Sequence, residues 1–110
     1  MKTAELTGAA LDWAVAKCEG YIDDSESWMY QAKSTDLKRS TFHPSIHWAQ
    51  GGPIIERECM TLNCGLIKSY AMKNVGYLVH EYGDTPLIAA MRCYVASKLG
   101  DEVEIPKELI

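Results

Sequence analysis

Gly83-Asp-Thr-Pro-Leu-Ile-Ala-Ala-Met-Arg-Cys-Tyr-Val-Ala-Ser-Lys-Leu-Gly100 is the clearest helix signal in the chain. Thr85 can cap the free amides of the first turn, and Pro86 suits the first helical position because proline has no N–H to leave unpaired. Gly100 can adopt the left-handed conformation that ends a helix. One apolar stripe recurs at helical spacing and consists of Leu87, Ile88, Met91, Val95 and Leu99. A helix of this kind requires a partner surface, which the rest of the chain must supply.

The segment before this helix has the pattern of a small β-sheet. Residues 66–73 and 76–82 are strand-like runs, and the turn residues Lys73-Asn-Val-Gly76 between them predict a hairpin. Residues 60–62 are a further short strand. After the helix, residues 101–106 form an extended acidic tail whose Val103 and Ile105 can contact the core.

The N-terminal segment predicts a second helix. Thr7 is its expected N-cap, Leu6 and Leu11 have the spacing of a hydrophobic staple, and Gly20 ends it. Residues 21–39 are mostly polar and are expected to form an exposed connection, with a short strand over 28–32. The order of elements predicts a single α+β domain over residues 1–110, with a small antiparallel sheet packed with helices in an α-β-α sandwich-like arrangement.

Residues 41–58 predict two short helical turns. Ser45 can cap a turn over 46–48, Gly51-Gly52 interrupts it, and Pro53 can begin a second turn. Each glycine inside a helix costs about 1 kcal/mol relative to alanine, so something local must favour the break. One explanation is a kink that lets the helix wrap over the sheet. The other is a backbone that closely approaches a ligand or partner.

The composition restricts the class of protein. The 110 residues suit one domain, and 47% of them are hydrophobic. A formal charge of −4 argues against nucleic-acid binding, which needs a basic face. The first residues lack the apolar core of a signal peptide, and no apolar run approaches a membrane span, so we expect a cytoplasmic protein with reduced cysteines.

No catalytic set can be assembled from the spacing of residues. His43 and His47 are four apart, as zinc ligands on one helix are, but Pro44 lies between them and no third ligand is close in sequence. His80 and Glu81 are neighbours in a predicted strand and therefore point to opposite faces. We accordingly expect no enzymatic activity, no metal and no cofactor.

One segment and two arginines suit a small anionic ligand. Arginine and exposed backbone amides favour a phosphate, and aromatic side chains can stack on a base. The candidate ligand-binding residues are Phe42, His43, Ser45, His47, Trp48, Gln50, Gly51, Gly52, Arg57 and Arg92. The alternative is that Trp48 belongs to the core and that both arginines form ion pairs within the chain, with Glu56, Glu58 or the acidic tail.

Three blocks resemble a known family. Residues 6–20, 48–58 and 85–106 are similar, in this order, to the NinX-like family of small phage and prophage proteins, which is related to phage proteins described as α-β-α sandwich domains. His47 stands where that family usually has an aspartate. The resemblance implies a phage origin and carries no settled function.

The residues and this resemblance together predict a non-enzymatic phage accessory protein. It would act inside the infected host cell, against the defence of the host. It would sequester a nucleotide-derived signal as a homo-oligomer with ligand pockets between subunits. The alternative is an inhibitor or adaptor that binds a host protein through the same aromatic residues.

Overall fold

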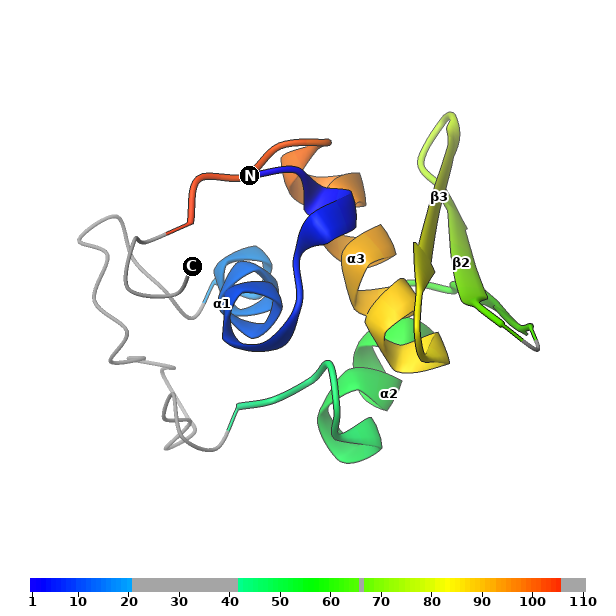
Figure 1. Cartoon of the computed structure of the whole chain (residues 1–110). Helices are drawn as coiled ribbons and strands as arrows, with labels where there is room; N and C mark the ends of the chain where they lie inside the picture. Colours follow the sequence, from blue (N-terminus) through cyan, green and yellow to red (C-terminus); the bar gives the residue numbers. More distant parts are fainter. Residues whose placement is uncertain (21–41, 66, 106–110) are drawn as a thin grey trace.

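Helix α3 (Pro86–Leu99) lies at the centre of the structure, and the other elements pack around it (Figure 1). This computed structural model describes residues 1–20, 42–65 and 67–105. The remaining elements are listed in chain order: the short 3₁₀ helix η1 (Thr3–Glu5), α1 (Gly8–Cys18), α2 (Trp48–Arg57), β1 (Thr61–Cys64), β2 (Ser69–Asn74) and β3 (Leu78–Gly83). Helices and an antiparallel sheet in separate segments give an α+β fold, as predicted.

The predicted ends of α3 are confirmed. Thr85 Oγ1 accepts a hydrogen bond from the amide of Ile88 at 3.1 Å, Pro86 occupies the first turn, and Gly100 has a φ of +86°. The predicted single apolar stripe is too narrow, because α3 is buried on nearly all sides. Its buried residues are Leu87, Ala89, Ala90, Met91, Cys93, Tyr94, Val95 and Ala96. Helices contact α3 on one side and the sheet on the other, and its alanines let these neighbours approach closely.

The sheet has three antiparallel strands in the order β1-β2-β3. Thr61 pairs with Met72, and Ser69 pairs with Gly83. The turn between β2 and β3 is held by Asn74, whose Oδ1 accepts a hydrogen bond from the amide of Gly76 at 3.0 Å, while Gly76 adopts a φ of +95°. The predicted hairpin is confirmed, and each of its strands begins two or three residues later than the sequence indicates.

The two faces of the sheet have different surroundings. Ala71 and Val79 are buried on the face toward α3. The opposite face carries Tyr70, His80 and Tyr82, whose rings meet edge to face with centroids 4.7 to 6.1 Å apart. In Figure 1 the helices lie on one side of β2 and β3. In the described part of the chain α3 therefore lies between the sheet and the other helices, and the aromatic face of the sheet is turned away from the helices. The predicted α-β-α order, with helices on both faces of the sheet, is not found there.

The N-terminal helix α1 forms as predicted, except for its expected capping hydrogen bond. Leu6 and Leu11 are fully buried, as expected of a hydrophobic staple, and Thr7 has the extended backbone of an N-cap. The side chain of Thr7, however, makes no capping hydrogen bond. The amide of Val103 donates to the carbonyl of Met1 at 2.9 Å, so the C-terminal tail packs against the start of the chain.

Helix α2 corrects the predicted break at Gly51-Gly52. It runs without interruption from Trp48 to Arg57, with Pro53 inside it. A Cβ atom on Gly51 would lie 2.5 Å from Leu87 Cδ1 and 2.6 Å from the carbonyl oxygen of Pro44. The glycine is thus required because α2 packs closely on α3 and on the preceding turn. The backbone of Gly51 does approach another group closely, but that group belongs to the same chain and is neither the ligand nor the partner of the predicted explanation.

One prediction lies outside the described residues. The polar connection over 21–39, with its short strand over 28–32, falls within the range that the structure leaves undescribed. The tail prediction is confirmed up to its last described residue, since Val103 is buried and Ile105 packs partly against the core.

Substituting Gly51→Ala should destabilise the protein, because the added Cβ meets both Leu87 and a backbone carbonyl. We expect a loss of about 1–3 kcal/mol in the free energy of unfolding, as for overpacking of a core. Urea denaturation followed by circular dichroism measures this loss.

The matched control is Gly52→Ala, whose Cβ would have only a Trp48 ring atom within 4 Å, at 3.9 Å. Alanine favours a helix more than glycine does, but its Cβ crowds the following proline ring. These effects oppose each other, so we expect only a small change in the free energy of unfolding. Equal losses for both variants would contradict the packing explanation for Gly51.

Candidate functional site

A tight turn before α2 exposes two large apolar side chains. Phe42 and Ser45 are buried on the inner side of this segment, and residues 44–46 form the turn. Ile46 is 65% exposed and Trp48 is 54% exposed. His47 lies between them and is also exposed. We call Ile46, His47 and Trp48 the anchor surface.

The turn is attached to α1 by a buried carboxylate. Asp12 Oδ1 accepts a hydrogen bond from the backbone amide of Ser45 at 3.0 Å, and Asp12 Oδ2 lies 3.4 Å from Nδ1 of His43. Burial raises the pKa of Asp12, and the contacts with Ser45 and His43 oppose part of that rise. Asp12 thus fixes the backbone that carries the anchor surface.

Additional contacts hold the same segment against α2. The side-chain oxygen of Gln50 accepts a hydrogen bond from the amide of His43 at 2.6 Å, and the rings of His43 and His47 are 5.8 Å apart between centroids. No group of three or more His, Cys, Asp or Glu side chains in the described ranges is placed to hold a metal ion. In this structure His43 faces Asp12 and its ring meets that of His47, so both rings take part in the packing of the turn.

The two glycines do not form an amide nest. The amide of Gly51 donates to the carbonyl of His47 at 2.9 Å, as in a regular helix. Gly52 follows in the same uninterrupted helix. An anion site of the expected kind requires amides that point outward from a loop or a helix end, and Gly51 and Gly52 do not lie at either.

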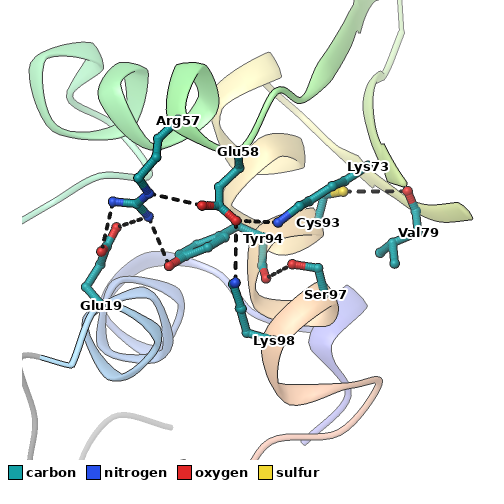
Figure 2. Close-up of polar contacts among 9 residues, drawn as sticks. All are labelled: Glu19, Arg57, Glu58, Lys73, Val79, Cys93, Tyr94, Ser97 and Lys98. Carbon is teal, nitrogen blue, oxygen red and sulfur yellow. Dashed lines mark hydrogen bonds and ion pairs between the residues drawn. The ribbon is translucent and has the colours of Figure 1, made fainter. Parts of the chain in front are cut away.

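Arg57 lies at the other end of α2 and is taken up by acidic partners in the chain (Figure 2). Its guanidinium donates to both carboxylate oxygens of Glu19, at 3.2 and 2.8 Å, and to Glu58 at 3.0 Å. It also donates to the hydroxyl of Tyr94 at 3.2 Å. Arg57 lies nine positions after Trp48 in the helix, which corresponds to about 14 Å along its axis. The alternative predicted for Arg57, an ion pair within the chain, is confirmed for Glu58.

Glu58 is the centre of a wider ionic network that links α2 to the sheet and to α3. Lys73 on β2 donates a hydrogen bond to Glu58, and Lys98 lies 3.6 Å from the same oxygen, Oε1 (Figure 2). The side chains of Lys73 and Glu58 are only 10% and 12% exposed, so water screens their attraction weakly. Lys73 together with Arg57 lowers the pKa of Glu58 to about 2.

Arg92 occupies a third, separate place. Its Nε donates to the carbonyl of Leu6 at 2.7 Å, and its Nη1 donates to the carbonyl of Tyr82 at 2.9 Å. The side chain thus connects the segment between η1 and α1 to the end of β3. The sequence placed Arg92 at the border of the apolar stripe, and it is half-buried there. Its partners are backbone carbonyls rather than the expected acidic groups.

The structure therefore divides the predicted ligand set into three parts. The residues from Phe42 to Gly52 lie together, whereas Arg57 and Arg92 are each held by other elements. Sequence reasoning missed Asp12, Glu19 and the exposure of Ile46. The available signal for Asp12 was a carboxylate on the apolar side of a helix, next to Leu11.

All four cysteines are described, and none forms a disulfide, as predicted. Cys93 is buried, and its thiol contacts the carbonyl of Val79 at 3.6 Å. Burial raises the pKa of Cys93 to about 11 and that of Cys18 to about 12. These two thiols therefore remain protonated at neutral pH. Within the described residues, no helix has the length and apolar character to cross a membrane.

Replacing Asp12 by alanine should loosen the turn, because the buried amide of Ser45 then loses its acceptor. We expect Asp12→Ala to cost about 1–3 kcal/mol of unfolding free energy. Asp12→Asn keeps an acceptor oxygen and should lose less. Chemical denaturation of both variants measures the difference, and equal losses would contradict the anchoring role of Asp12.

Removing Glu58 should change the acid stability of the protein. The ordinary pKa of Glu58 is 4.5 and its pKa in the fold is about 2, so its contribution is complete above about pH 5 and is lost as the pH falls toward 2. Glu58→Gln should therefore unfold with a flatter dependence on pH between 5 and 2. At neutral pH it should lose about 1–3 kcal/mol, as hydrogen bonds to charged groups do.

The matched control for Glu58 is Glu56→Gln, at an exposed position on the same helix. Thermal melts at a series of pH values should show the wild-type slope for the control. If the stability of Glu58→Gln fell with decreasing pH as steeply as that of the wild type, the assigned role of the network would be refuted.

A family model described as "Bacteriophage P22, NinX" matches residues 2–98, which include α1, the turn, α2, the sheet and nearly all of α3. No curated protein matches the chain. Since the family model covers far more than half of the 110 residues, this chain belongs to the NinX family of phage proteins.

Proposed function

We propose that this phage protein is a non-enzymatic accessory protein that binds a protein of the infected host through the anchor surface. The observation that carries the proposal is the exposure of Ile46 and Trp48 on a turn fixed from beneath. Tryptophan is enriched among the residues that contribute most to protein–protein affinity. Large apolar side chains that are half or more exposed on a small domain gain free energy when a partner covers them.

The rigidity of the turn supports this proposal. Asp12 bonds the backbone of the turn, and Gln50 bonds the segment that leads into it. The carbonyl of Pro44 is packed against Gly51 of α2. A surface that is already ordered loses little conformational entropy on binding, so more of the contact energy appears as affinity.

A protein partner fits the described geometry better than an anionic small molecule does. The guanidinium of Arg57 is bonded to two carboxylates, and that of Arg92 to two carbonyls. The amide of Gly51 is bonded within α2. A phosphate at the anchor surface would therefore lack the cations and amides that the sequence interpretation assigned to it. Sequestration of a nucleotide-derived signal remains a prediction, and the experiment below also tests it.

Trp48→Ala should abolish capture of the host partner while leaving the fold intact, because the indole is mostly in water in the free protein. The measurement is crosslinking of the purified chain in host lysate, followed by mass spectrometry of the captured proteins. Binding of the identified protein to wild type and variant is then compared by calorimetry. We expect a loss of at least tenfold in affinity, about 1.4 kcal/mol.

Ile67→Ala is the matched control, since this large apolar residue is 91% exposed just before β2, outside the anchor surface. It should capture the same protein as wild type. Equal capture by the Trp48 variant would refute the proposal. Native mass spectrometry of the lysate-exposed chain that showed a bound small molecule, and no protein, would favour sequestration instead.

A further inference from the structure

Strand β3 has a free edge. It pairs with β2 on one side, and among the described residues no strand pairs with its other side. A free edge presents unpaired backbone N–H and C=O groups and can accept a further strand.

One end of this edge strand is already engaged. The carbonyl of Tyr82 accepts a hydrogen bond from Arg92, and the same side chain holds the carbonyl of Leu6. This contact occupies the end of β3 that leads into α3. At the other end of β3, from Leu78 to Glu81, the Cys93 thiol contacts the carbonyl of Val79 at 3.6 Å, and among the described residues no arginine is recorded as binding the backbone.

A groove lies at that other end. It has a volume of about 370 Å³ and runs between β3 and the C-terminal end of α3. Its walls include Tyr77, Leu78 and His80 on one side and Gly100 and Asp101 on the other. Tyr77 and Leu78 are 66% and 63% exposed, so the groove offers apolar and aromatic surface next to free strand backbone.

The groove is negatively charged. Glu81 and Asp101 both line it, and burial together with the nearby charge of Asp101 raises the pKa of Glu81. The charges of Arg92 and His80 lower the pKa of Glu81, but they offset only part of the rise. The backbone of Asp101 is held in place, because its carbonyl accepts a hydrogen bond from the amide of Thr3 at 2.8 Å. The two carboxylates that line one groove favour a cationic group.

We propose that this groove binds an extended segment of a partner protein that carries a lysine or arginine, added as a fourth strand at the free edge of β3. The strand backbone supplies hydrogen bonds that do not depend on sequence, and the groove supplies selectivity. The cationic end group pairs with Glu81 and Asp101. Its aliphatic stem covers Tyr77.

The charges favour this occupant over two others. A nucleic acid carries phosphates, which the carboxylates of Glu81 and Asp101 repel. A second copy of this chain has a net charge of −4 and would bring the same Glu81 to the same edge. A basic extended peptide has neither disadvantage.

The test begins with selection of a random heptapeptide library on the immobilised full chain. We expect the enriched sequences to contain a lysine or arginine at a constant position among β-branched residues. The best peptide is then labelled, and its dissociation constant is measured by fluorescence anisotropy. Failure to enrich any peptide, or enrichment without a basic residue, overturns the proposal.

Variants of the groove decide whether the peptide binds there. Glu81→Gln and Asp101→Asn should each weaken binding about tenfold, and Glu104→Gln, at an exposed position of the tail, should not change it. Glu81→Lys should bind the peptide whose basic residue is exchanged for glutamate. Equal affinity of the chain and its Glu81 and Asp101 variants contradicts the proposal.

Two further measurements separate this site from the anchor surface and from a contact through side chains alone. Trp48→Ala should leave the peptide affinity unchanged, so the anchor surface can fail its own test without affecting this one. Hydrogen exchange should slow at β3 amides when the peptide is bound. Slowed exchange at α2 with unchanged β3 would overturn strand addition.

Discussion

Burial of α3 on almost every side is the constraint on which the rest of the structure depends. Its inner residues range from Ala89 and Ala90 to the large Tyr94, and all three are 2% exposed or less. A helix that is apolar all round cannot be stable in water, and it must be enclosed from several directions. In this chain α1, α2, η1 and the sheet each contact it. Every surface feature of the described residues is therefore placed by how its element packs on α3.

The close approach of α2 to α3 illustrates this dependence. Gly51 permits contact with Leu87 and with the carbonyl of Pro44, and this contact fixes the turn that carries Ile46 and Trp48. At the other end of α2, Glu58 binds Lys73 on β2 and so ties the helix to the sheet. The helix is thus held at both ends, by close packing at one and by charge at the other. Its N-terminal turn can then present apolar side chains without moving.

The two arginines that looked like ligand-binding residues serve cohesion in this fold. Arg57 joins α2 to Glu19 beside the end of α1, and Arg92 joins Leu6 to Tyr82 at the end of β3. In both cases, groups of the chain itself occupy the positions that a ligand's anionic groups would take. The same contact of Arg92 also determines which end of the β3 edge stays open. Internal cohesion and the available binding surfaces are therefore consequences of the same few side chains.

Local signals in the sequence determined the elements and their order. The proline and threonine before Leu87, the turn residues around Gly76 and the period of the apolar residues act over a few positions, so they could be read without the fold. Family membership could also be recognised from the blocks of residues. The sequence did not determine that α2 continues through Gly51, that Asp12 supports the turn, or that Arg57 and Arg92 have partners within the chain. Only the tertiary structure decided these, because each includes a contact between residues more than thirty positions apart, which no local pattern encodes. These contacts join Gly51 to Leu87, Ser45 to Asp12, Arg57 to Glu19, and Arg92 to Leu6.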